Sequence, residues 1–427
     1  MSDPLPGFPM SPSPAGFPAE LSTASRHLLE MVPCLAGRVF PVPGRFRADL
    51  YRSVVELSRL LTSRRGDLPG GYMGRPDMLS AYLRYFLPWN LYRLVRLLPA
   101  LPLSLNSGDA VTDIGSGPLT LPLALWIARP EFRSLPLEFR CLDRAEGALK
   151  AGRRLFTALA GPESLWKIKT IHTSLTVPVK GPPAALVTAV NVYNEVFGNI
   201  PHTDHHSLTQ LAEREARRLA ALAAPGGGVL IVEPGVPRSG EFIACLRAAL
   251  REQGRPPCAP CTHVGPCPFP GGKSSPAGRR LGGEKRKWCH FVFDTRDAPW
   301  SFLEFSTAAG LPKERAALSF IFTGPAARPD TAEMTIRILS DPFPLSMGGK
   351  PGRYGRYGCS EQGAALICGE KKEVYAVNAG AVLHAPVPAP GSERRDPRTG
   401  ALAVEPWRRR LRQPEISPPY KSETRAT

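Results

Sequence analysis

Between residues 109 and 251, short apolar runs alternate with stretches that carry apolar side chains at helical spacing. Runs of this length suit buried strands, and the spacing between them suits helices that cover a sheet. The pattern predicts strands at residues 110–114, 138–142, 184–192 and 228–233, and helices at residues 119–127, 145–159, 207–223 and 242–251. Because strands and helices alternate, we expect a doubly wound, Rossmann-like α/β fold with a parallel sheet.

The regions on either side of this domain have other patterns. Residues 21–108 carry apolar side chains at helical spacing and predict a helical module, with Pro88 breaking or kinking its second half. The α/β domain is expected to span residues 109–325, with late strands at 289–293 and 318–323, and a small β module to follow at 326–385, with strands within 334–339 and 363–383. The Pro-rich residues 1–20 and the Pro-rich, basic residues 386–427 are predicted to be disordered.

The first predicted strand runs into a glycine-rich bend, Asp113-Ile114-Gly115-Ser116-Gly117-Pro118. Glycines let the backbone turn sharply and approach a ligand closely, and the helix that follows offers N–H donors. Asp143 ends the second strand, where an acid binds ribose hydroxyls in related dinucleotide folds. A nicotinamide dinucleotide prefers a third glycine where this chain has Thr120. An aspartate two residues before the first glycine is instead the first motif of S-adenosylmethionine-dependent methyltransferases. The cofactor-binding residues predicted are Asp113, Gly115, Ser116, Gly117, Asp143 and Asn191.

The fourth strand ends in a polar stretch at the edge where methyltransferases hold their substrates. Asn191, Asn194 and Glu195 either contact a ligand or cap the next helix, and Glu233 is a weaker candidate of the same kind. The stretch has neither the Asn-Pro-Pro-aromatic signature of amino-group methylation nor a Pro-Cys nucleophile for pyrimidine methylation. No catalytic residue is therefore predicted.

Four of the nine cysteines gather around one Pro- and Gly-rich segment: Cys258, Cys261, Cys267 and Cys289. Four thiolates satisfy either tetrahedral zinc or an iron–sulfur cluster, and His263 or His290 is close enough in sequence to replace a cysteine at zinc. The segment is a loop, and bound metal would supply the energy that holds it. Residues 271–287 are predicted to be a mobile, basic insertion. The remaining cysteines are predicted core thiols, with Cys359 and Cys368 as a buried pair.

The net charge and the apolar content of the chain indicate which kinds of binding partner to expect. The net charge of +17 favours a polyanion such as RNA, although a general enrichment in arginine would also produce it. No stretch reaches the ~18 apolar residues of a membrane span, and the N-terminus resembles neither a secretory signal nor a transit peptide. The expected location is cytoplasmic, with no membrane partner.

These features together resemble one family, the methyltransferase-like proteins of the mitochondrial small ribosomal subunit and their bacterial relatives. The resemblance covers about residues 72–383, and its matching pieces are 79–83 (LSAYL), 113–118 (DIGSGP), 192–195 (VYNE), 232–235 (VEPG), 259–268 (APCTHVGPCP) and 288–291 (WCHF). It implies a class I methyltransferase sheet that binds S-adenosylmethionine at Asp113, Gly115, Gly117 and Asp143. It also implies a four-iron, four-sulfur (4Fe-4S) cluster on Cys258, Cys261, Cys267 and Cys289.

The resemblance further implies action on the small ribosomal subunit and its rRNA, in assembly or translation, by a chain that is monomeric off the ribosome. Two functions remain open. One is a methyltransferase with an RNA substrate, in which the enzyme works mostly by positioning. The other is a catalytically inactive binding factor for ribosome assembly. A nicotinamide oxidoreductase is disfavoured by Thr120.

Overall fold

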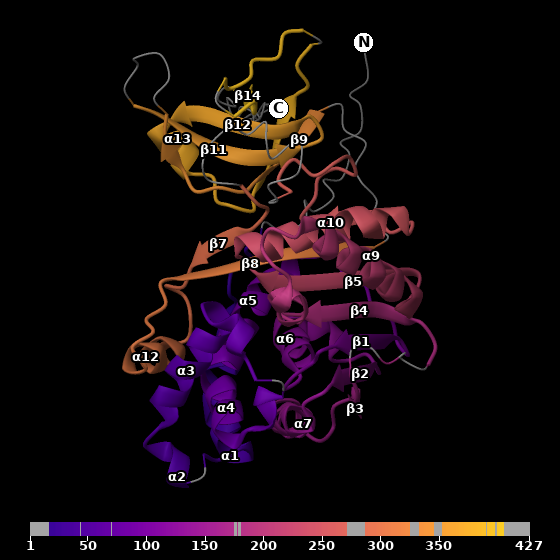
Figure 1. Cartoon of the computed structure of the whole chain (residues 1–427), viewed down its shortest axis with the longest axis vertical. Helices are drawn as coiled ribbons and strands as arrows, with labels where there is room; N and C mark the ends of the chain where they lie inside the picture. The colour runs from indigo at the N-terminus through magenta and orange to yellow at the C-terminus, as the bar shows by residue number, and fades with distance from the viewer. Residues whose placement is uncertain are drawn as a thin grey trace, which may run out of the picture.

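The computed structural model describes residues 17–42, 44–69, 71–174, 177, 181–270, 287–324, 333–345, 352–389, 391–397 and 399–404. Within these ranges, a large sheet lies in the middle, a group of N-terminal helices lies below it and a smaller sheet lies above it (Figure 1). Residues 1–16, the insertion up to residue 286 and residues 405–427 lie outside the described ranges, so the predictions of disorder and mobility made for them stay predictions. No described helix is long and apolar enough to cross a membrane.

The larger sheet has the predicted doubly wound topology. Its strands are β1 (Ala110–Ile114), β2 (Glu138–Asp143), β3 (Lys167–His172), β4 (Ala184–Val190), β5 (Ala223–Pro234), β6 (Pro257–Ala259), β7 (Phe291–Asp294) and β8 (Arg315–Thr323). The order is β3-β2-β1-β4-β5-β8-β6, and β7 also pairs with β8. The first five strands are parallel, whereas β8 is antiparallel to β5. Because the strand order reverses between β1 and β4, a crevice is expected at their carboxyl ends.

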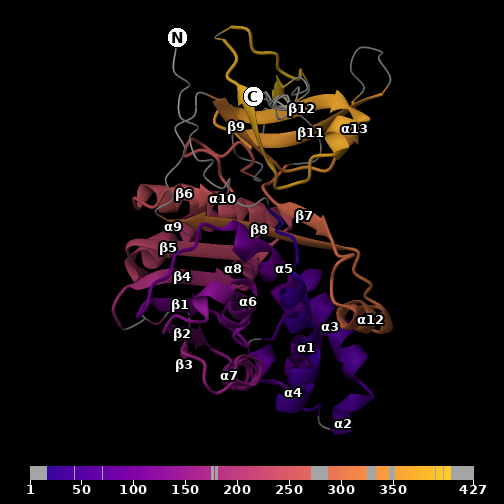
Figure 2. The same cartoon turned by 180° about the vertical axis from the view of Figure 1, so that it is seen from behind.

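Helices cover both faces of this sheet, as the alternating pattern predicted. They are α6 (Thr120–Ala128), α7 (Glu146–Ala160), α9 (His205–Leu222) and α10 (Pro237–Glu252). The apolar sides of α6 and α7 belong to one buried cluster, and those of α9 and α10 belong to a second. The two clusters are the two faces of the sheet, which Figure 2 shows from behind. The sheet is therefore buried on both sides, which suits its run of Val, Ile, Leu and Ala.

The N-terminal helices share their core with the large sheet. They are α1 (Thr23–Val39), α2 (Gly44–Arg47), α3 (Leu50–Thr62), α4 (Pro76–Ala81) and α5 (Leu87–Leu97). α5 packs on α6 and α1 packs on α7, and one buried cluster runs from these helices into the sheet. The helix α12 (Trp300–Ala308), inserted between β7 and β8, packs beside α1. The expected boundary near residue 108 is thus a change of secondary structure within a continuous core.

A π-helical turn joins α4 to α5 at the predicted kink. The turn is η3 (Tyr82–Phe86), and Pro88 stands in the first turn of α5. Proline has no N–H to donate four residues back, so the regular ladder cannot pass through it. The wider turn absorbs this interruption, and such turns are frequent at functional sites. Tyr82, in this turn, faces the cavity described below.

The smaller sheet contains more of the chain than the sequence predicted. Its strands are β9 (Glu333–Ile338), β10 (Phe343–Pro344), β11 (Arg353–Ser360), β12 (Gly363–Glu370), β13 (Val382–Pro386) and β14 (Leu402–Val404), with the helix α13 (Lys371–Tyr375) after β12. The order is β13-β9-β11-β12-β14, and β10 pairs with β11. Residues 386–404 were expected in a disordered tail, but β14 pairs in parallel with β12 and buries Leu402. At the other end, Phe17 packs edge-on against Phe291 and Phe320, so order begins before residue 21.

We predict that Gly152→Ala destabilises the fold, although alanine normally favours a helix over glycine by about 1 kcal/mol. A Cβ atom on Gly152 of α7 would lie 2.3 Å from the backbone carbon of Pro118, in the glycine-rich bend. Backbone cannot move aside as a side chain can, so we expect a loss of about 1–3 kcal/mol in the free energy of unfolding, measured by urea denaturation.

Gly147→Ala is the matched control in the same helix, because its nearest neighbour would be a Leu79 methyl carbon at an ordinary 3.7 Å. This variant should be as stable as the unmodified chain or more stable. Equal effects of the two substitutions would show that the contact between α7 and the bend does not limit the fold.

Candidate functional site

The glycine-rich bend directly follows β1. Gly115 and Gly117 have φ angles of +64° and +53°, a region that side chains rarely adopt. A Cβ atom on Gly115 would also lie 2.4 Å from a methyl carbon of Val192, beyond the end of β4. Both the backbone angle and the lack of space therefore require glycine at this point. The bend brings the first turn of α6 over the carboxyl ends of the strands.

Asp113 lies beneath the bend and is 1% exposed. Its carboxyl group accepts hydrogen bonds from Ser116 Oγ at 2.5 Å and from Thr188 Oγ1, on β4, at 2.7 Å. Burial raises the pKa of Asp113 to about 7, against the lowering effect of these two hydroxyls. Asp113 does not line the cavity above the bend. The structure thus places this predicted cofactor ligand as a support that joins the bend to the next strand.

Asp143 ends β2 and faces the cavity. Its carboxylate accepts hydrogen bonds from the backbone N–H groups of Gly117 at 2.8 Å and Ala145 at 2.7 Å. Burial raises the pKa of Asp143, and these backbone donors oppose the rise. A carboxylate has about four acceptor positions, so it can accept further hydrogen bonds from a bound ligand. Asp143 is therefore both an anchor for the bend and a group available to the cavity.

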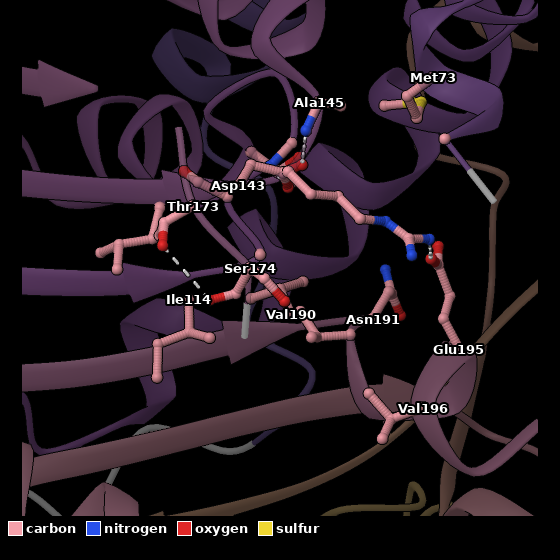
Figure 3. A pocket seen from close by; sticks show the side chains of 18 of the residues that line it. Met73, Ile114, Asp143, Ala145, Thr173, Ser174, Val190, Asn191, Glu195 and Val196 are labelled. Carbon is pink, nitrogen blue, oxygen red and sulfur yellow. Dashed lines mark hydrogen bonds and ion pairs between the residues drawn. The ribbon is translucent and has the colours of Figure 1, made fainter. Parts of the chain in front are cut away.

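The cavity has a volume of about 190 Å³, more than ten times the ~15 Å³ needed for one water molecule. Five of the six predicted cofactor residues line it: Gly115, Ser116, Gly117, Asp143 and Asn191. Asn191 has a φ of +57°, and strained backbone of this kind gathers at ligand sites. In Figure 3 Asp143 and Asn191 lie on different sides of this space, on the ends of β2 and β4.

Of the remaining polar candidates, one caps a helix and another lines the cavity. Glu233, at the end of β5, accepts hydrogen bonds from the backbone N–H groups of Val192, Tyr193 and Asn194. It caps the short helix α8 (Tyr193–Val196) and does not line the cavity. Glu195 does line the cavity, where it accepts a hydrogen bond from the Tyr72 hydroxyl at 3.0 Å and pairs with Arg144 at 3.2 Å.

Sequence reasoning missed the cavity residues that come from outside the α/β pattern. Tyr72 and Met73 lie on a 3-10 turn, η2 (Tyr72–Gly74), of the N-terminal helices, and Thr173 and Ser174 follow β3. Figure 3 shows Met73 beside the space that these residues line. Burial, followed by the Glu195 carboxylate, raises the pKa of Tyr72 well above its usual range, so its hydroxyl stays a donor. No sequence motif marks these positions, because only the tertiary fold brings them to the cavity.

The cysteine segment lies between the two sheets. Cys261, Cys267 and Cys289 influence one another electrostatically, and each of them also influences Cys359 on β11 of the smaller sheet. Cys359 and Cys368 are both buried free thiols, as the sequence predicted, and the sulfur of Cys359 lies 3.1 Å from Nε2 of His263. Cys258 lies on β6, and its sulfur is 3.4 Å from the carbonyl oxygen of Phe322.

Burial dominates the chemistry of these thiols. It raises the pKa of Cys267 to about 11, with a further rise from Cys261, and it raises the pKa values of Cys289 and Cys359 well above their usual range. The thiols of Cys267, Cys289 and Cys359 are therefore protonated at neutral pH until a metal displaces the protons. Within the described ranges, no group of three or more His, Cys, Asp or Glu side chains is arranged to hold a single metal ion. The donor set is nevertheless one that suits soft metals and iron–sulfur clusters.

A protein-family model described as "Mitochondrial small ribosomal subunit Rsm22" matches residues 107–321, about half of the chain. The chain belongs to the Rsm22 family. The matched region runs from the start of β1 into β8 and includes the cavity strands and the cysteine segment through Cys289. The family description names a mitochondrial protein, so it does not support the cytoplasmic location expected from the sequence, which stays a prediction.

Solved structures give a weaker likeness to this Rsm22-family chain, and no curated protein matches it. A methyltransferase from Thiobacillus denitrificans with S-adenosyl-L-homocysteine is 14% identical over 56% of this chain and 91% of its own, with a TM-score of 0.30. Phosphoethanolamine N-methyltransferase 2 from Haemonchus contortus, with S-adenosyl-L-methionine, is 12% identical over 61% of each chain, with a TM-score of 0.31. A methyltransferase from Pyrococcus furiosus is 13% identical over 39% and 72%, with a TM-score of 0.27. We draw no conclusion about activity from these values.

We predict that Asp113 makes the stability of the fold depend on pH. Its pKa is about 7 in the folded chain and 3.8 ordinarily, so its contribution is complete below about pH 4 and is lost as the pH rises through 7. Asp113→Asn keeps hydrogen-bonding groups without ionising. Between pH 4 and pH 8 the difference in stability should shift in favour of the variant by about 1.4 kcal/mol for each pH unit between the two pKa values.

Urea denaturation at pH 4 and pH 8 measures this effect, because groups other than Asp113 titrate alike in both proteins. A difference in stability that is the same at both pH values would mean that Asp113 ionises at its ordinary pKa.

Proposed function

We propose that the chain binds S-adenosylmethionine in the cavity at the carboxyl ends of β1, β2 and β4. The location supports this proposal, because ligands of doubly wound sheets bind where the strand order reverses. The bend, Asp143 and Asn191 supply the polar groups along the wall of the cavity. The single observation that carries the proposal is the Asp143 carboxylate, held by two backbone donors at the end of β2 and still able to accept from ribose hydroxyls.

Each cavity residue has a defined task in this proposal. Bound S-adenosylmethionine would supply an activated methyl group. Asp143 would bind its ribose, and the glycine-rich bend would let the backbone approach it closely. Asp113 holds the bend to β4 through Ser116 and Thr188 and so acts as a positioning residue. Tyr72 and Met73 line the cavity from the N-terminal helices.

We propose the small ribosomal subunit and its rRNA as the partner. The description of the Rsm22 family supports the subunit, and the net charge of +17 favours contact with the phosphate backbone of RNA. The proposal covers assembly or translation, with the chain monomeric when it is off the ribosome.

A second function, binding without methyl transfer, is favoured by one contact. Glu195, the acidic side chain beside the cavity, is engaged with both Tyr72 and Arg144. A carboxylate in that state is a weak general base, and catalysis would have to come from positioning alone. The assembly-factor role therefore stands beside the methyltransferase role.

We propose that the buried thiols hold a 4Fe-4S cluster, with zinc as the alternative. A multi-iron cluster is wider than one ion, so its thiolates lie farther apart than those of a single-metal site. Cys261, Cys267 and Cys289 come from the predicted set, and we propose Cys359 as the fourth ligand because all three lie within electrostatic range of it. The sequence predicts Cys258 as a ligand, and its sulfur lies 3.4 Å from the carbonyl oxygen of Phe322. The bound metal would fix the loop between the two sheets.

We predict that Asp143→Asn weakens S-adenosylmethionine binding roughly 10- to 100-fold, because it removes a charged acceptor of hydrogen bonds. Isothermal titration calorimetry measures the Kd. The matched control is Asp109→Asn, which changes the same residue type just before β1, at the opposite edge of the sheet. An unchanged Kd for Asp143→Asn would reject the proposed site.

Small ribosomal subunits incubated with the chain and radiolabelled S-adenosylmethionine separate the two functions. Label in the rRNA that is lost with Asp143→Asn supports a methyltransferase. Co-sedimentation with the subunit without label supports a binding factor. The absence of both rRNA label and co-sedimentation with the subunit would reject the ribosomal role.

We predict that Cys359→Ser removes the metal and that Cys258→Ser leaves it in place. Both variants replace one sulfur by oxygen near the same segment, so each is the control for the other. Iron, sulfide and zinc analysis after anaerobic purification, with visible absorbance, measures the outcome. The reverse result would restore Cys258 as the ligand, and a colourless unmodified chain with stoichiometric zinc would reject the iron–sulfur cluster.

A further inference from the structure

Two buried arginines flank the cysteine segment from opposite sides. Arg247 lies on α10, against the larger sheet, and is 4% exposed. Arg337 lies on β9, in the smaller sheet, and is 9% exposed. In Figure 1, α10 and β9 stand on either side of the loop between the sheets. A positive charge is thus buried on each side of the same group of thiols.

Both arginines donate hydrogen bonds to the cysteine segment. Arg247 donates from Nε to the sulfur of Cys261 at 3.1 Å, and from its terminal nitrogen to the carbonyl oxygens of His263 and Gly265. Arg337 donates to the carbonyl oxygens of Pro260 at 3.0 Å and Gly380 at 2.6 Å. Each guanidinium therefore holds the backbone of the loop and brings its charge close to the sulfurs.

The titratable groups within electrostatic range of these two arginines are cysteines. Arg247 interacts electrostatically with Cys261, Cys267 and Cys359, and Arg337 with Cys261, Cys289 and Cys359. Neither forms an ion pair with a carboxylate among the described residues, whereas the equally buried Arg238 pairs with Glu241 at 2.9 Å. A buried charge is costly unless an opposite charge compensates it. Neutral thiols do not compensate it, but thiolates bound to a metal would.

We infer that Arg247 and Arg337 are positioning residues that balance the negative charge of a thiolate-ligated cluster and raise its reduction potential. This inference rests on the iron–sulfur cluster of the proposed function. Four thiolates around an iron–sulfur core leave a net negative charge, and reduction adds one more. A guanidinium on each side stabilises the reduced state more than the oxidised state. The cluster is thereby retained in its buried site and is easier to reduce than it would be without the two charges.

Potentiometric titration with dithionite and mediators tests this inference on the full-length, anaerobically purified chain. Arg247→Gln and Arg337→Gln keep a polar side chain but remove the charge. For each we expect the equilibrium constant for one-electron reduction to fall at least tenfold, a shift of about 59 mV to lower potential. Arg247→Lys restores the charge and should return the potential toward that of the unmodified chain, even though its hydrogen bonds differ.

The matched control is Arg255→Gln. Arg255 also donates to several carbonyl oxygens, among them those of Gly227 and Ala223, but no thiol is among its contacts in the described structure. Its variant should leave the potential unchanged. Glutamine variants that keep the cluster at an unchanged potential would overturn the inference and leave the cluster itself established.

If the chain does not hold the proposed iron–sulfur cluster, the experiments give a result that differs from an unchanged potential. If the unmodified chain holds zinc, the rate of zinc release to a chelator replaces the potential. Faster release from Arg247→Gln than from Arg255→Gln would then support the charge-balancing role, and equal rates would overturn it. An unmodified chain without any metal overturns both the cluster and the role of the arginines.

Discussion

The hydrogen bonds of the buried Asp113 carboxyl group are the constraint on which the cavity depends. One oxygen accepts from Ser116 in the bend, and the other accepts from Thr188 on β4, so a single side chain fixes the bend relative to the next strand. Those two strands are the ones between which the sheet order reverses. Gly115 then fits against Val192 and Gly152 fits against Pro118, with no space for a Cβ atom at either contact. The shape of the cavity follows from these contacts between backbone and side chain, before any ligand is present.

Hydrogen bonds join the smaller sheet to the cysteine segment. Arg337 reaches from β9 to Pro260, and the hydroxyl of Thr262 donates to the carbonyl oxygen of Cys359 on β11. Apolar contacts add to these hydrogen bonds, because Tyr357 and Leu366 of the smaller sheet belong to the same buried cluster as the N-terminal helices and the large sheet. A metal bound by thiols from both sheets would strengthen this existing connection.

The sequence predicted the parts of the fold whose pattern is local. β1, β2, β4 and the bend follow from apolar runs and glycines, and the doubly wound topology is confirmed. β3 was missed because it is an edge strand, and its charged residues Lys167 and Lys169 interrupt the apolar pattern. β14 was missed because three residues in a polar, Pro-rich stretch carry too little pattern, and pairing with β12 determines their structure. Tyr72 lines the cavity and Cys359 lies near the thiols of the cysteine segment only through the tertiary fold, so spacing along the chain could not indicate them.

The cavity and the cysteine segment are connected through the end of β5. Glu233 accepts from three backbone N–H groups beside the cavity, and two residues later the carbonyl oxygen of Gly235 accepts from the indole of Trp288, next to Cys289. The contacts that shape the bend, however, come from β1, β2, β4 and α7, and none of them involves a cysteine of the segment. The bend can therefore form without metal, and the metal would chiefly order the loop and the smaller sheet. The proposed binding of the methyl donor and the proposed retention of a metal would thus be separable properties of one chain, joined at a single strand end.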